Sequence, residues 1–155
     1  MVQIGAGGAG AATAYALLGQ GAREVRILDL DHGRATSLAA SLSLRFQDRK
    51  VHAVENLQAA LTDADGLVNA TPIGMSKHPG SAVANELLRP ELWIADIVYF
   101  PLNTALLQAA RAAGCRTLDG GGMAIYQAVR AFELFTGRSA DAARMRRHFD
   151  RIAAA

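Results

Sequence analysis

A glycine-rich turn near the start of the chain has the spacing of a phosphate-binding loop. The apolar segment Val2–Ile4 leads into it, an alanine-rich segment follows it, and glycines stand at positions 5, 7 and 10. In this spacing the first glycine permits a tight turn, the second leaves room for a pyrophosphate against the backbone, and the third lets helix and strand pack closely. The phosphate charge then meets unpaired N–H groups at the positive end of the helix dipole. A flexible turn would show the same glycines, but the flanking segments favour a dinucleotide site made of Gly5, Ala6, Gly7, Gly8, Ala9 and Gly10.

A carboxylate follows the second apolar segment, where a nucleotide site needs one. Val25–Leu28 ends at Asp29, which follows Gly10 by 19 positions. An acidic residue at about this distance accepts a hydrogen bond from the adenosine ribose. Asp29 could instead cap the next helix, but Asp31 is the better candidate for that cap. Because a carboxylate at the ribose repels a 2′-phosphate, the sequence favours NAD over NADP as the cofactor.

Composition excludes several other classes of function. A chain of 155 residues forms one domain with a sizeable core, and a net charge of +2 gives no reason to expect a nucleic-acid partner. No apolar run is long enough to cross a bilayer, and no signal peptide precedes the glycine turn. Cys115 is the single cysteine, which excludes an internal disulfide and is typical of a cytoplasmic protein. The four histidines have no metal-ligand spacing, so we expect no metal site.

Strand and helix patterns alternate along the whole chain. The predicted strands cover residues 2–4, 25–28, 51–54, 66–70, 93–98 and 115–118. The predicted helices cover residues 11–18, 32–46, 57–61, 105–113, 123–135 and 140–152, with a helical turn near 86–88. This alternation predicts an α/β fold of the Rossmann type, with a doubly wound six-stranded parallel sheet, in a single domain over residues 1–155. The last two helices are additions to that fold.

Two loops follow predicted strands and therefore belong to a candidate site. Thr71–Met75 contains proline and glycine, which stop regular structure after the strand 66–70. Tyr99–Leu102 likewise follows the strand 93–98. In an open parallel sheet, ligands bind at the carboxyl ends of the strands. Both loops are therefore expected beside the glycine turn.

Four motifs together resemble the shikimate and quinate dehydrogenases, and the resemblance covers nearly the whole chain. The motifs are Gly5–Gly10, Val68–Met75, Asp96–Thr104 and Gly120–Gln127. The resemblance implies an oxidoreductase that, as a complete enzyme, moves a hydride between NAD and the C3 hydroxyl of quinate or shikimate. The protein's part in such chemistry is to position the nicotinamide against the reacting carbon.

The resemblance also implies roles for individual residues. Tyr99 and Gln127 match positions that border the substrate, and the Gln127 amide offers both a donor and an acceptor to ring hydroxyls. Positions that match the nicotinamide side of the cofactor are Asn69, Thr71, Pro72, Met75, Ile97, Val98, Gly120, Met123 and Ala124.

The segment after the second strand resembles the NAD-dependent members of the family. It reads Asp29-Leu30-Asp31, whereas the NADP-dependent members carry a segment similar to Asn-Arg-Thr at this place. Leu30 thus stands where an arginine would hold the 2′-phosphate. Arg34 matches an arginine on the cofactor side in the NAD-dependent subgroup, although a solvated helix face would also explain it.

The family's catalytic pair has no counterpart in this sequence. In the family a lysine and an aspartate handle the proton of the reacting hydroxyl, and both belong to an N-terminal substrate domain. This chain starts at the first strand of the nucleotide domain, and its two lysines, Lys50 and Lys77, lie in no matching motif. We therefore assign no catalytic residue, expect the chain to be inactive alone, and expect a substrate domain as its partner.

Three interpretations stay open at this point. The chain is the cofactor half of a quinate/shikimate dehydrogenase, a non-catalytic stand-alone NAD-binding or assembly module, or an unrelated oxidoreductase of the same fold. The predicted helix 123–135 is apolar on more than one face. It favours an exposed patch near Tyr99 and Gln127, and self-association as a homodimer.

Overall fold

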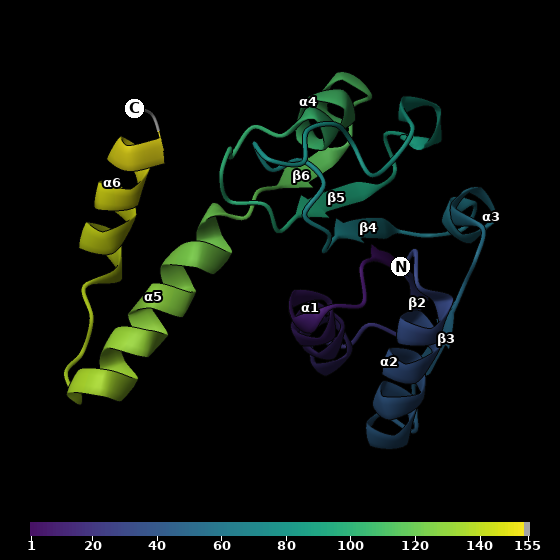
Figure 1. Ribbon diagram of the computed structural model, residues 1–155, viewed down its shortest axis with the longest axis horizontal. Helices are drawn as coiled ribbons and strands as arrows, with labels where there is room; N and C mark the ends of the chain where they lie inside the picture. The colour runs from purple at the N-terminus through teal and green to yellow at the C-terminus, as the bar shows by residue number, and fades with distance from the viewer. Residues whose placement is uncertain (154–155) are drawn as a thin grey trace.

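The computed structural model describes residues 1–153, and its centre is a six-stranded parallel sheet (Figure 1). The strands lie in the order β3-β2-β1-β4-β5-β6. Their bounds are β1 Val2–Ile4, β2 Glu24–Leu28, β3 Lys50–Ala53, β4 Gly66–Asn69, β5 Trp93–Asp96 and β6 Arg116–Leu118. The chain runs outward from β1 to β3, returns to place β4 beside β1, and then runs outward on the other side. This reversal creates a crevice beyond the carboxyl ends of β1 and β4, where ligands of such sheets bind.

The helices occur where the sequence predicts them, with ends that differ by a few residues. Their bounds are α1 Gly8–Gly19, α2 His32–Arg45, α3 Leu57–Leu61, α4 Ala105–Ala112, α5 Gly121–Thr136 and α6 Ala142–Ala153, with a 3₁₀ turn η1 at Asn85–Leu87. The largest difference is at α1, which begins at Gly8 rather than at residue 11, because two glycines of the turn already have helical geometry. The predicted doubly wound α/β fold is confirmed.

Two apolar clusters hold the helices against the sheet. In one cluster Leu18 of α1 packs with Val25 and Ile27 of β2 and with residues of α2. In the other, Ile94 of β5 packs with Leu107 of α4 and with residues of α3 and β4. Each fully buried side chain of this size stabilises the fold by about 1.5–3 kcal/mol. The clusters therefore fix both layers of helices, and with them the strand ends that form the crevice.

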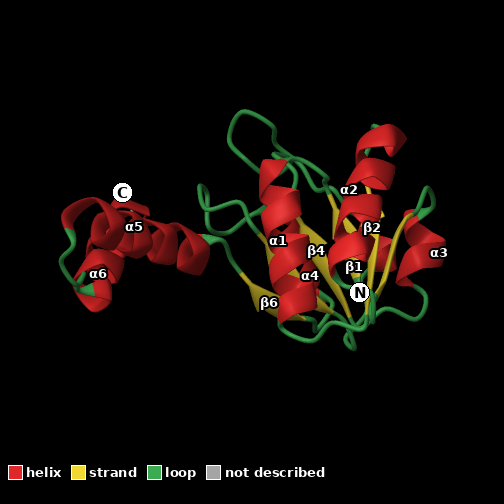
Figure 2. Cartoon of the chain, turned by 90° about the horizontal axis from the view of Figure 1, so that it is seen from below, coloured by secondary structure: helices red, strands yellow, loops and turns green. Residues whose placement is uncertain are grey.

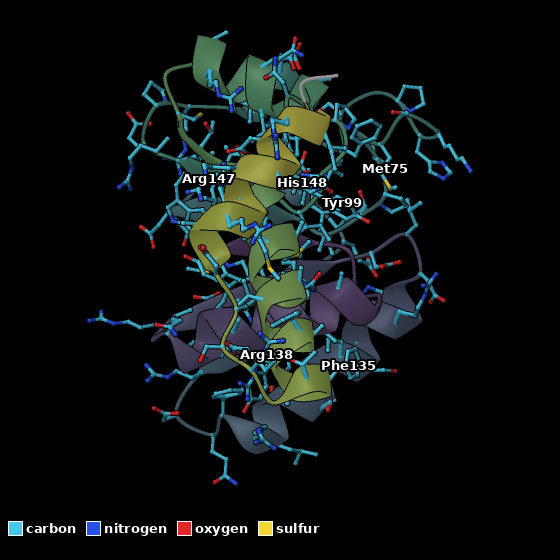
Figure 3. All side chains as sticks on the ribbon, turned by 90° about the vertical axis from the view of Figure 1, so that its left-hand side faces the viewer. Met75, Tyr99, Phe135, Arg138, Arg147 and His148 are labelled. Atoms are coloured by element: carbon cyan, nitrogen blue, oxygen red, sulfur yellow. The ribbon has the colours of Figure 1, made fainter. Side chains whose placement is uncertain are left out.

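The C-terminal helices α5 and α6 stand beside the sheet rather than on it (Figure 2). They pack on each other, and α5 meets the sheet only near its start (Figures 1 and 2). After the turn Asp119-Gly120, α5 extends away from the edge strand β6, and Leu134 and Phe135 near its other end are 67% and 88% exposed. Figure 3 labels Phe135 at the far end of α5.

No helix within residues 1–153 combines the length and the apolar character needed to cross a membrane. The same residues contain no cluster of histidine, cysteine, aspartate and glutamate side chains that could hold a metal ion.

Candidate nucleotide site

The three glycines of the turn have three different surroundings. A Cβ atom on Gly5 would lie 2.5 Å from the Ala70 carbonyl oxygen, and Gly5 also has a φ of +101°. A Cβ on Gly10 would lie 2.2 Å from the Gly5 carbonyl oxygen. At Gly7, by contrast, a Cβ would have no neighbour within 4 Å. The first and third glycines are thus required by close packing, whereas the backbone at Gly7 faces open space that a ligand can fill.

The N-terminus of α1 is open toward this space. Gly7 is its N-cap residue and supplies no side-chain hydrogen bond, and the first turn of α1 contains no acidic residue. The first N–H groups of a helix need partners from outside the helix, and they carry the positive end of its dipole. The turn therefore fits a pyrophosphate.

Gln3, which sequence reasoning missed, is hydrogen-bonded to the backbone of the turn. Its side chain is fully buried, and its Nε2 donates to the carbonyl oxygens of Gly5 at 2.9 Å and Gly10 at 2.8 Å. Its Oε1 accepts a hydrogen bond of 2.7 Å from the Thr13 hydroxyl. A polar residue inside an apolar strand was the available signal. Its partners on the turn and on α1 could not be deduced from its position.

Asp29 lies at the end of β2 and fastens the other side of the turn. Its Oδ2 accepts a hydrogen bond of 2.7 Å from the Ala6 N–H, and its Oδ1 accepts one of 2.9 Å from the Asp31 N–H. Partial burial opposes ionisation of Asp29, but these two backbone hydrogen bonds and the charge of Arg34 together outweigh it and lower the pKa of the carboxyl below its usual value. Asp29 is therefore an ionised group beside the glycine turn at neutral pH.

Asp31 caps α2, as its position predicts. Its Oδ1 accepts a hydrogen bond of 3.2 Å from the Arg34 N–H, and its Oδ2 lies 3.4 Å from Arg34 Nε. Both side chains are more than half exposed, and Leu30 between the two aspartates is fully exposed. The end of β2 thus presents two carboxylates and one partnered guanidinium to solvent.

A cavity of about 1020 Å³ lies between the glycine turn, the loops after β4 and β5, and the start of α5. Eleven of the predicted site residues line it: Gly7, Gly8, Ala9, Thr71, Pro72, Met75, Ile97, Val98, Tyr99, Met123 and Gln127. Figure 3 labels two of these residues, Met75 and Tyr99. Lys77 is the one charged side chain in the lining. Its volume is at the upper end of the range of about 300–1,000 Å³ that is typical of ligand pockets.

The remaining predicted residues lie around this cavity rather than in its lining. Gly5, Ala6 and Gly10 form the inner side of the turn. Asp29 lies beyond it at the end of β2, and Asp31 and Arg34 follow at the start of α2. Ala124 follows Met123 along α5, and Asn69 is fully buried behind the loop 71–75.

Gly120 borders a second hollow of about 540 Å³, on the sheet face between α1 and the start of α5. Its floor contains Trp93 and Ala95 of β5, and Met123 lines both hollows. A Cβ on Gly120 would lie 2.4 Å from the Ile97 carbonyl oxygen. The glycine therefore lets the start of α5 approach the end of β5, which closes one wall of the larger cavity.

A doubly wound parallel sheet, an uncapped helix behind a glycine turn, and a carboxylate at the end of β2 together define a dinucleotide-binding domain of the Rossmann type. Comparison with known proteins identifies the family. The family model of the shikimate 5′-dehydrogenase C-terminal domain matches residues 120–148. A shikimate dehydrogenase (NADP(+)) of Streptomyces avermitilis is 56% identical over 147 residues, which are 94% of this chain and 50% of that protein. The chain belongs to the shikimate and quinate dehydrogenase family.

Two further relatives bear on the cofactor. A quinate/shikimate dehydrogenase (NAD(+)) of Corynebacterium efficiens is 48% identical over 96% of this chain and 53% of its own length. The solved structure of quinate dehydrogenase from Corynebacterium glutamicum in complex with NAD superposes with a TM-score of 0.90 at 48% identity, over 96% of this chain and 53% of that one. The chain thus spans about half the length of the curated relatives it matches. Their names include both NAD(+) and NADP(+).

Proposed function

We propose that this chain is the NAD-binding part of a quinate/shikimate dehydrogenase, which transfers a hydride between NAD and the C3 hydroxyl of quinate or shikimate. One observation carries the proposal: a single cavity joins the glycine turn to Tyr99 and Gln127. A cofactor held at the turn and a substrate held at these two side chains would therefore meet in the same space. The NAD complex of a relative with nearly the same fold supports this assignment.

The proposed site has three zones, formed by residues that line the cavity or lie around it. In the first, the N–H groups around Gly7, Gly8 and Ala9 hold the pyrophosphate, and Asp29 and Arg34 hold the adenosine ribose. In the second, Thr71, Pro72, Met75, Ile97, Val98, Gly120, Met123 and Ala124 surround the nicotinamide, which supplies the hydride-accepting carbon when it is bound. In the third, the Tyr99 hydroxyl and the Gln127 amide orient the hydroxylated ring, since both can pair with ring hydroxyls.

The charges at the end of β2 favour NAD over NADP. Asp29 and Asp31 both lie beside the proposed ribose site, where a carboxylate repels the 2′-phosphate of NADP. The guanidinium of Arg34 already lies beside Asp31, and Leu30 offers no second cation. The names of the relatives support either cofactor, so the preference rests on these side chains.

The proton of the reacting hydroxyl needs a partner beyond this lining. Lys77 is the one titratable side chain in the lining besides the phenol of Tyr99, and it sits on an exposed loop. The 155-residue chain is therefore expected to be inactive alone, because a positioned acid–base group typically contributes about 10²–10⁴-fold to rate. A substrate domain that supplies this group is the proposed partner, and the cytoplasm is the proposed compartment.

The same lining favours one rival, a non-catalytic NAD-binding or assembly module. The reading frame upstream of Met1 separates the two proposals. An uninterrupted frame that encodes a substrate domain supports the dehydrogenase, whereas an in-frame stop supports the module.

Calorimetric titration with NAD tests the cofactor site through Gly7→Ala. The added methyl has room in the protein and an ordinary backbone geometry, but it occupies the space proposed for the pyrophosphate. We expect the affinity for NAD to fall by about 10-fold or more. Gly19→Ala at the other end of α1 is the matched control, because a Cβ there also meets no neighbour. Equal affinities in the two variants would rule out the proposed site.

A further inference from the structure

Three buried polar residues lie together behind the two loops of the larger cavity. Asn69 ends β4, Asp96 ends β5, and Thr104 precedes α4, and their exposed fractions are 0%, 2% and 1%. None of them lines the larger cavity. Buried polar side chains are retained only with hydrogen-bond partners, because leaving such a group unpaired destabilises the fold.

Asp96 connects the other two residues. Its Oδ1 accepts hydrogen bonds from Asn69 Nδ2 at 3.0 Å and from the Val98 N–H at 3.1 Å. Its Oδ2 accepts one of 2.7 Å from the Thr104 hydroxyl. Burial raises the pKa of Asp96, and the three hydrogen bonds oppose that rise. Both carboxyl oxygens are therefore used inside the protein, and one of the donors is the backbone of the segment that follows β5.

Asn69 extends the network into the loop 71–75. Its Nδ2 also donates to the Ile73 carbonyl oxygen at 3.0 Å. Its Oδ1 accepts from the Thr71 N–H at 3.1 Å and from the Thr71 hydroxyl at 2.7 Å. One side chain thus satisfies two residues of the loop and the carboxylate of the neighbouring strand.

Gly74 brings the far end of the same loop onto the network. Its φ is +108°, and a Cβ there would lie 3.4 Å from Thr104 Cγ2 and 3.7 Å from Asp96 Oδ2. The loop is therefore held at Thr71 and Ile73 by Asn69 and rests on Thr104 and Asp96 at Gly74.

The outward side of each anchored segment faces the cavity. Thr71, Pro72 and Met75 line it from the loop, and Ile97 and Val98 line it from the end of β5. We infer that Asn69, Asp96 and Thr104 are positioning residues that hold these two walls at a fixed separation and so shape the nicotinamide end of the cavity. The inference rests on the proposed NAD binding. It also gives Asn69 an indirect role, because this side chain acts through the loop.

A comparison of two ligands tests this role. ADP-ribose contains the pyrophosphate and the adenosine but lacks the nicotinamide, so it needs the glycine turn and Asp29 but not the two anchored walls. Asn69→Leu keeps the branching of the side chain and removes the amide. We expect the wild-type chain to bind NAD more tightly than ADP-ribose, and Asn69→Leu to lose about 10-fold in affinity for NAD with less than about 2-fold change for ADP-ribose.

A second pair of variants keeps the test independent of the folding of Asn69→Leu. Thr104→Val removes the hydroxyl that donates to Asp96, and Thr104→Ser keeps it. We expect the selective loss of NAD affinity in the valine variant and its recovery in the serine variant. Because Thr104 also caps α4, Asn56→Ala is the control: it removes the cap of α3, away from the cavity, and should change neither affinity.

The outcomes distinguish a failure of the positioning role from a failure of the proposed NAD binding. Equal losses for both ligands, no loss for either, or equal wild-type affinities for NAD and ADP-ribose would overturn the positioning role while leaving NAD binding intact. A wild-type chain that binds neither ligand would instead overturn the proposed function.

Discussion

The sheet region, residues 1–120, and the helix pair α5–α6 are built in opposite ways. In the sheet region the large apolar side chains of the central strands are buried, and buried polar groups such as Gln3 and Asp96 are paired. In the helix pair, Gly121 and Ile125 of α5 are buried, whereas α6 has no buried residue and the end of α5 leaves Phe135 88% exposed. The first region is held by its own interior, and the second presents apolar surface.

The cavity lies at the border of these two regions, and its two ends are therefore held to different degrees. The proposed cofactor end is formed by a turn whose backbone is hydrogen-bonded to the Gln3 and Asp29 side chains. The proposed substrate end includes Gln127, whose helix is attached to the sheet mainly through its first turns. The cofactor end is therefore preorganised, whereas the position of Gln127 depends on whatever contacts α5. Preorganisation of one ligand site and adjustment of the other suit an enzyme in which the cofactor binds independently of the substrate.

The largest expected effect is on stability, and it distinguishes the regions directly. Gly10→Ala should destabilise the fold by about 3 kcal/mol or more, because the new Cβ would lie 2.2 Å from a backbone oxygen that cannot move aside. Gly122→Ala in α5 meets no neighbour and should stabilise the chain by up to about 1 kcal/mol. Thermal unfolding followed by circular dichroism measures both. Similar melting temperatures for the two variants would contradict the tight packing of the turn.

A smaller effect, about tenfold, is expected on cofactor preference. Asp29→Asn should reduce the ratio of NAD to NADP affinity more than Asp31→Asn does, because it removes the charge nearest the ribose and leaves the cap of α2 in place. Calorimetry with each cofactor gives the ratios. A larger change of this ratio in the Asp31 variant would show that Asp31, and not Asp29, contacts the ribose.

The same Asp29 variant should also respond differently to acid. Since the folded-state pKa of Asp29 lies below its unfolded value, its contribution to stability is present above the unfolded pKa and is lost as the pH falls through the folded pKa. Asp29→Asn should therefore show a shallower loss of stability on acidification than the wild-type chain.

The last expected effect concerns self-association through the helix pair. If the exposed end of α5 supports a homodimer, Phe135→Glu should weaken association by about tenfold or more, since burial of one such side chain stabilises a contact by about 1.5–3 kcal/mol. Leu44→Glu is the matched control, because Leu44 is 78% exposed on α2 in the sheet region. Sedimentation across a concentration series measures both. A wild-type chain that is monomeric at every concentration would contradict the proposed homodimer.

Some residues could be interpreted from local spacing alone, whereas the roles of Tyr99 and Gln127 came only from the family resemblance. Gly5, Gly7 and Gly10 are separated by fixed steps, and Asp31 precedes a helix by one residue, so each could be interpreted without the fold. Gln3 and Asp96 could not, because their partners come from other elements and depend on strand order and register. The direction of α5 was likewise not predictable. An amphipathic pattern shows that a face prefers burial but does not identify what covers it.

The hydrogen bond from Ala6 to Asp29 ties the proposed cofactor preference to the structure of the glycine turn. The carboxylate that is proposed to repel the 2′-phosphate of NADP also accepts a hydrogen bond from that turn, so replacing Asp29 alone would loosen the proposed site for either dinucleotide. The Leu30 side chain is fully exposed, so replacing it does not disturb the packing of the turn. An arginine there would be tolerated by the fold and would introduce a cation beside the ribose. On the proposed NAD preference, a change toward NADP would therefore begin at Leu30, with Asp29 changing last.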